Sequence, residues 1–271
     1  MLHSIRVFIF ISLFSYLSFV QAHPLWVLPN EFSVSSEGAA WITVDVSASN
    51  VLFNYDHSFG LDNVLIHSPD GSKKPIDHYF KGHLRSVFDL QLTQNGTYKI
   101  EMKRPPLFFT TYTTEGNSRP QRLLADKEKA KAQLPADAKE VKTLLIHLES
   151  STYVTNNGLS EQVLKPTGKG LELQAITHPN DIVRGEPVEF QLLVNGQPTA
   201  DIEVELTPNG TQYRNERGAL KFKTDAEGKF SFTPEQAGAW LMLAGINQPS
   251  DTPLADMKRL MLYITLEVVL D

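Results

Sequence analysis

The residues of this chain with the clearest chemical potential are histidines, and the first of them follows an export signal. Residues 1–22 contain the basic residue Arg6, an apolar run over residues 7–20, and the small residue Ala22 at their end. This pattern is typical of a secretory signal peptide and predicts cleavage after Ala22. His23 would then begin the mature chain, with a free α-amine and an imidazole on one residue.

An α-amine and an imidazole on the same residue can bind one metal ion as a chelate, the geometry called a histidine brace. Pro24 has no backbone N–H, so the metal cannot recruit a deprotonated amide there. A second imidazole would complete three nitrogens suited to copper, whereas further oxygens or imidazoles would suit nickel, cobalt or zinc. The alternative interpretation is that cleavage exposes a histidine that only begins a strand.

Two other positions are candidate partners for His23. Asp56 precedes His57, and a carboxylate beside a histidine can bind the metal directly or orient the ring. His178 ends a predicted strand of the second half of the chain, from where it could reach a site between domains or simply form a turn. We therefore predict His57 as the leading partner, with Asp56 ligating or orienting it, and His178 as the next candidate.

The remaining histidines of the mature chain give weaker signals. His78 and His83 lie five residues apart around Gly82, which is typical of a solvated turn more than of a closed metal loop. His67 and His147 lie within strand-like runs, and this favours structural roles.

Composition excludes several classes of function. The chain has no cysteine, so thiolate metal sites and cysteine nucleophiles are excluded. Its net charge of −6 disfavours nucleic acid as a partner. Glycine-rich phosphate loops, HExxH and Gly-x-Ser-x-Gly motifs are all missing from the sequence, which favours a protein without enzymatic activity.

Alternating apolar and polar residues predict an all-β fold. Strand-like runs cover residues 41–46, 86–92, 97–102, 107–112 and 141–148, and turn signals such as Asn95-Gly96 separate them. Residues 123–134 are instead rich in helix formers and end before Pro135. They predict a short helix inserted in the first β domain.

A polar segment rich in Gly and Pro, residues 165–170, predicts a domain boundary. We expect a signal peptide over residues 1–22, an N-terminal β-sandwich domain over 23–165 and a C-terminal domain over 166–271. The last stretch contains about seven short strands with Asn-Gly and Glu-Gly turns, which predicts an immunoglobulin-like β-sandwich.

The order of several short motifs resembles a known bacterial family, DUF4198. These motifs are His23-Pro24-Leu25-Trp26, Asp56-His57, Pro69-Asp70-Gly71, Ser86-Val87-Phe88-Asp89, Gly96-Thr97-Tyr98, residues 165–172 and residues 177–181. The resemblance implies a periplasmic protein of a Gram-negative bacterium with β-sandwich domains. It also implies a relationship to periplasmic components of cobalt or nickel uptake systems, with His23, Asp56, His57 and His178 at the recurring polar positions.

These observations predict a periplasmic metal-binding protein that captures nickel, cobalt, copper or zinc and delivers it to a membrane importer. After signal cleavage no membrane span is expected. One alternative is a copper histidine-brace redox protein. Another is a metal-free adhesion or carbohydrate-binding module, in which exposed aromatics such as Trp26 or Tyr112 would make the contacts.

Overall fold

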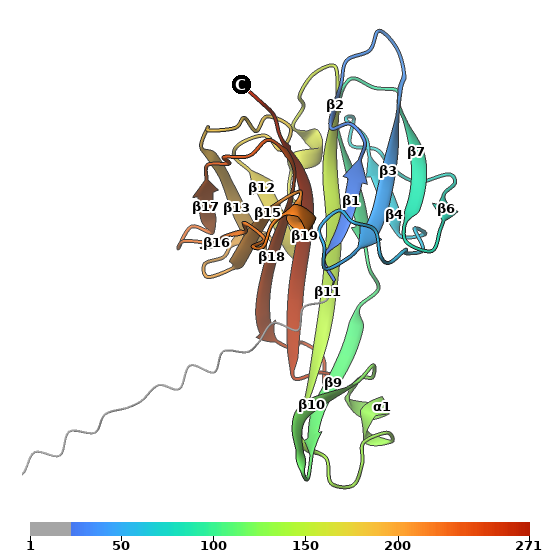
Figure 1. The fold of residues 1–271 in the computed structure, drawn as a ribbon, viewed down its shortest axis with the longest axis vertical. Coiled ribbons are helices and arrows are strands. Elements are labelled where there is room, and N and C mark those ends of the chain that lie inside the picture. The colour runs from blue at the N-terminus through green and yellow to red at the C-terminus, as the bar shows by residue number, and fades with distance from the viewer. Residues whose placement is uncertain (1–22) are drawn as a thin grey trace, which may run out of the picture.

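β-Strands form most of residues 23–271, the part of the chain that the computed structural model describes (Figure 1). The all-β prediction is therefore confirmed. The predicted signal peptide, residues 1–22, lies outside this part. Among the described residues no helix has both the length and the apolar character needed to cross a bilayer.

The first half of the chain forms two facing sheets. The first sheet has the strand order β1-β3-β7-β6, with β1 at Leu25–Pro29, β3 at Ala40–Ala48, β7 at Ser86–Leu92 and β6 at Phe80–Lys81. The second sheet continues β5-β4-β8-β11, with β5 at Lys73–Pro75, β4 at Val64–His67, β8 at Gly96–Lys103 and β11 at Lys139–Asn156. A short strand, β2 (Ser33–Val34), pairs with the end of β11.

The second half repeats this arrangement. One sheet contains β12 (Leu171–Ala175), β13 (Val188–Val194), β14 (Gln197–Pro198) and β17 (Lys229–Phe232), with β13 between β12 and β17. The other has the order β16-β15-β18-β19, with β16 at Leu220–Lys223, β15 at Glu203–Pro208, β18 at Gly238–Pro249 and β19 at Met257–Val268.

Both halves have immunoglobulin-like strand orders. In the usual lettering, the first half has sheets A-B-E-D and C′-C-F-G, and the second half has A-B-E and C′-C-F-G. The predicted immunoglobulin-like sandwich of the C-terminal half is thus confirmed. The N-terminal half is a β-sandwich, as predicted, and its strand order is also immunoglobulin-like, which the sequence did not indicate.

The two halves share one continuous sheet, because the last strand of each pairs with the other. β11 runs parallel to β19, with nine residue pairs from Leu144–Met257 to Thr152–Thr265. Figure 1 shows these two long strands side by side at the centre of the molecule. The predicted boundary at 165–170 falls between the short 3-10 helix η1 (Gln162–Leu164) and β12, while the sheet itself crosses from one half to the other.

The two sandwiches lie on opposite faces of the shared sheet. Along β19, Met261 and Tyr263 belong to the core of the first half, whereas Leu262 and Ile264 belong to the core of the second. This follows from the period of two along a strand, which sends alternate side chains to opposite faces. Tyr153 of β11 likewise packs into the second core.

The N-terminal part of β11 extends beyond both sandwiches as an arm. There it pairs with β9 (Leu107–Thr114), which forms a hairpin with β10 (Asn117–Leu123), and Figure 1 shows this arm projecting at one end. The predicted helix over 123–134 is shorter in the structure: α1 covers Lys127–Lys131, capped by Asp126. Residue 123 belongs to β10 because its pairing with Thr110 outweighs its helix propensity.

Candidate metal centre

His23 and His57 meet at the end of strand β3. β1 pairs with β3 so that Leu25 lies opposite Ala48, and on the other side of Ala48 the backbone of His57 forms a β-bridge. The amide of Ala48 donates to the His57 carbonyl at 3.2 Å, and the amide of Ser49 donates to the Pro24 carbonyl at 3.2 Å. The backbone therefore holds two residues 34 positions apart on either side of one strand end.

The side chains of His23, Asp56 and His57 form a compact group. One ligand atom from each can be chosen so that all lie within 4.8 Å of one another. His57 Nδ1 lies 3.2 Å from Asp56 Oδ2, and the rings of His23 and His57 are 4.6 Å apart between centroids. The structure thus brings together three of the four predicted site residues.

This group offers two imidazoles and one carboxylate to a metal. Ligand atoms bound 2.0–2.1 Å from one zinc or similar ion lie roughly 3–4 Å from each other, so only small side-chain rotations are needed. All three side chains are exposed and free to make such rotations. Removal of residues 1–22 would add the α-amine of His23 as a fourth donor.

The loop that presents Asp56 and His57 is tied to the sandwich beneath it. The buried hydroxyl of Ser47 accepts from the Asp56 amide at 3.4 Å and donates to the Leu84 carbonyl at 2.8 Å. The Phe53 ring packs edge-on against Trp26 at 5.5 Å between centroids. These contacts hold the loop in place, so the position of His57 relative to His23 is fixed by the fold.

The same loop also contacts the second half of the molecule. The amide of Leu52 donates to Thr211 Oγ1 at 3.0 Å, where Thr211 begins the 3-10 helix η2 (Thr211–Tyr213). The His23 group therefore lies beside the junction between the two sandwiches.

His178, the fourth predicted residue, is not part of the group. Its Nδ1 accepts from the Asn180 amide at 3.1 Å, so the proton is on Nε2, which lies 3.3 Å from the Ser160 carbonyl and 3.2 Å from Thr97 Oγ1. Burial lowers the pKa of this ring, which favours its neutral form. Both nitrogens are engaged: Nδ1 in a local turn, and Nε2 in contacts to Ser160 and Thr97 that join the two halves.

The other histidines lie elsewhere. His78 and His83 are in exposed segments that flank β6, and His147 is in β11. His67 is buried in β4, and its Nε2 lies 3.4 Å from Glu101 Oε2.

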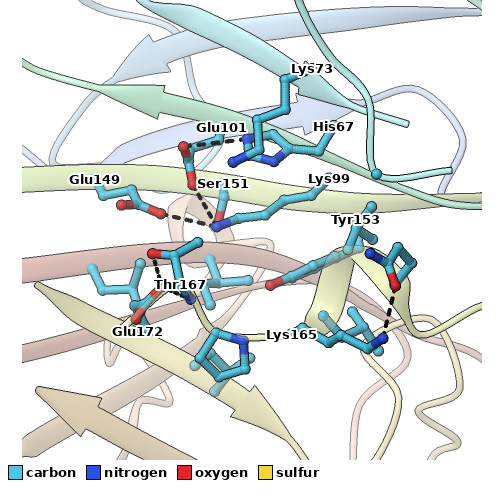
Figure 2. Close-up of a pocket in the computed structure, with 18 residues that line it drawn as sticks. His67, Lys73, Lys99, Glu101, Glu149, Ser151, Tyr153, Lys165, Thr167 and Glu172 are labelled. Carbon is cyan, nitrogen blue, oxygen red and sulfur yellow. Dashed lines mark hydrogen bonds and ion pairs between the residues drawn. The ribbon is translucent and has the colours of Figure 1, made fainter. Parts of the chain in front are cut away.

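Glu101 belongs to a buried ion cluster that the sequence analysis missed. Lys99 Nζ lies 2.6 Å from Glu101 and 3.1 Å from Glu149, and Lys103 Nζ lies 3.2 Å from each of the same carboxylates. Lys99, Glu101 and Glu149 line a cavity of about 180 Å³ together with Tyr153. Figure 2 shows these side chains around the cavity. The pattern Lys-x-Glu-x-Lys on one face of β8 was the available signal.

The charges of this cluster depend on one another. Burial raises the pKa of Glu101, but the His67 ring 3.4 Å away and the charge of Lys99 outweigh it and hold that pKa well below its ordinary value. Burial lowers the pKa of Lys99, but Tyr153, Glu149 and Glu101 raise it above its ordinary value. Burial also raises the pKa of Glu149. The charge on each carboxylate therefore depends on the lysines beside it.

Comparisons with known proteins give a family and distant structural likenesses. No sequence among curated proteins matches this chain. The solved structures similar to it include the D0-D1 domain of intimin (12% identity, TM-score 0.22), which aligns over 90% of this chain and 98% of that one. They also include the adhesin InvE of Yersinia pseudotuberculosis (9%, TM-score 0.22, 89% of this chain and 58% of that one).

A third is the polymeric immunoglobulin receptor ectodomain of a teleost fish, with 11% identity, a TM-score of 0.19, and 92% of this chain and 99% of that one covered. Likenesses at these scores say nothing about activity. The family model described as "Domain of unknown function (DUF4198)" matches residues 20–248, and the chain belongs to this family.

Proposed function

We propose that the mature protein is an exported, periplasmic transition-metal-binding protein of the nickel and cobalt type. It captures the metal through His23, Asp56 and His57 and delivers it to a membrane importer. The observation that carries this proposal is the convergence of the three side chains, with ligand atoms within 4.8 Å of one another. The role in uptake extends from the resemblance of the chain to DUF4198 proteins.

The donor set suits a divalent metal that is bound and released without a catalysed reaction. Two imidazoles, a carboxylate and an α-amine are ligands that nickel, cobalt, copper and zinc accept. The exposure of the group leaves room for water ligands and for transfer of the metal to a partner.

A copper histidine-brace protein is the second candidate. The pairing of His57 with His23 supplies the second imidazole that a T-shaped set of three nitrogens requires. Oxygen-dependent turnover of the copper-loaded protein would favour this candidate over simple metal capture.

The third alternative is a metal-free adhesion module, and the two aromatic residues suggested for its contacts are buried. Trp26 is fully buried and Tyr112 is 9% exposed, so neither side chain is available to a partner. The sequence could not decide their exposure, because strand residues alternate between faces and only the sandwich packing decides which face is covered.

The decisive experiment compares two N-termini. Calorimetry with Ni²⁺, Co²⁺, Cu²⁺ and Zn²⁺ is run on protein that begins at His23 and on protein with one extra residue before it. We expect strong binding only in the first, because the extra residue converts the α-amine into an amide nitrogen. Equal affinity in both would remove the chelate, and no binding of any metal by the first would overturn the proposal.

A further inference from the structure

A second opening lies next to the His23 group, on the outer face of the second half. It is a groove of about 540 Å³, bordered on one side by Pro24 and floored by β15, β16, β18 and β19. Its apolar floor is formed by Leu243, Met261 and Tyr263, which lie on the same face of the sheet. Pockets of this size, mainly apolar with a few polar groups, are typical of small-molecule sites.

The polar part of the groove carries an excess of positive charge. Four cations line it against two carboxylates, Glu203 and Glu205, and Lys221 Nζ lies 3.8 Å from Glu205. The remaining cations are Arg217, Lys223 and Arg259. In a chain with a net charge of −6, this local excess favours an anionic ligand.

Arg217 provides a specific donor for such a ligand. Its backbone carbonyl accepts from the Arg214 guanidinium at 3.0 Å, which anchors the loop. Its side-chain Nε is buried but has no hydrogen-bond partner among the residues that the structure describes. The Arg217 side chain also lines the groove, so a carboxylate there would pair with its guanidinium through charge-assisted hydrogen bonds.

Gly245 leaves space in the floor of the groove. It is buried in β18 opposite Met261, and a Cβ placed there would lie 3.5 Å from the Arg259 guanidinium. Any larger side chain at this position would therefore project into the volume that a ligand would occupy.

We propose that this groove binds an amphipathic organic carboxylate, with its apolar body on Leu243, Met261 and Tyr263 and its carboxylate at Arg217. This site is separate from the metal centre, although Pro24 connects the groove directly to His23. The test below uses no metal, so its failure and the failure of metal binding are distinguishable.

The test measures binding of naphthalene-2-carboxylate to the protein that begins at His23, by calorimetry without metal. The uncharged 2-naphthamide and the cationic 2-naphthylmethylamine serve as matched probes. We expect the carboxylate to bind at least about tenfold more tightly than the amine. The amine cannot accept a hydrogen bond from Arg217, and its positive charge is repelled by the cations of the groove. Comparable affinity of carboxylate and amine would overturn the proposal.

Two variants locate the site, and one serves as control. Arg217→Gln should weaken carboxylate binding about tenfold, and Gly245→Val should weaken both the carboxylate and the amide by filling the floor. Arg119→Gln, on the exposed hairpin strand β10, should change nothing. Circular dichroism verifies folding of each variant. Should Gly245→Val fail to fold, Arg217→Gln decides alone, and unchanged carboxylate affinity in that variant would overturn the proposal.

Discussion

The two C′-C-F-G sheets of the molecule have equivalent outer faces that are used in opposite ways. In the first half this face carries the Lys99, Glu101 and Glu149 cluster, and η1 and β12 close over it to leave about 180 Å³. In the second half β1 covers only part of the face, and a groove of about 540 Å³ remains open beside Pro24. One fold therefore gives a covered face and a partly open face, because η1 and β12 cover the first, whereas β1 covers only part of the second.

The largest effect is expected on the closed face. Lys99→Met should lower the free energy of unfolding by about 3 kcal/mol, because it leaves two largely buried carboxylates with Lys103 as their remaining cation. Lys73→Met, an exposed lysine that lines the same cavity, is the matched control and should change stability by less than about 0.5 kcal/mol. Urea denaturation measures both, and equal losses would show that the cluster is not a stabilising unit.

A smaller effect of the same cluster is its response to acid. The pKa of Glu101 is depressed on folding, so its stabilisation is present above the ordinary glutamate pKa and is lost as pH falls below about 4.3. Glu149 has a raised pKa and opposes this trend in part. Urea midpoints measured from about pH 7 to pH 3 should therefore fall in the wild type.

The same titration should show the wild type and Lys99→Met converging at low pH. Protonation removes the unpaired carboxylate charges on which the cost of that variant depends. A constant difference between the two proteins across this range would contradict the electrostatic origin of the effect.

Variants of the two histidines predicted as partners of His23 should affect different properties, one the metal affinity and the other the stability. His57→Ala should weaken metal binding by at least about 10–100-fold, because it removes a ligand from an exposed group whose contribution to folding is small. His178→Ala should leave metal affinity unchanged and lower stability by about 1–2 kcal/mol, since it removes hydrogen bonds at Ser160 and Asn180. Calorimetry and urea denaturation together measure both, and a loss of metal affinity in His178→Ala would contradict the assignment.

The smallest effect is expected from a cation at the open groove. Lys223→Gln should change the free energy of unfolding by less than about 0.5 kcal/mol, because this side chain is exposed. It should still weaken naphthalene-2-carboxylate binding at low salt, and this difference should shrink as salt is added. A stability loss comparable with that of Lys99→Met would remove the contrast between the two faces.

Local sequence signals predicted the strands that form the cores. The alternation over residues 41–46 and 86–92 became β3 and β7, because each has one face buried in the first core. The same signals could not show that β11 extends to eighteen residues or that it pairs with β19. That pairing joins residues more than a hundred positions apart, and no local pattern encodes it.

The sequence by itself determined the all-β class, the adjacency of Asp56 and His57, and the presence of His23 immediately before a strand. Only the tertiary structure decided that His23 and His57 lie together, because this depends on both segments flanking Ala48. It also decided that His178 lies in a hydrogen-bonded junction and that Lys99, Glu101 and Glu149 share one cavity. The physical reason is that side-chain chemistry is a property of each residue, whereas proximity is created by non-local strand pairing and by the choice of which sheet face is covered.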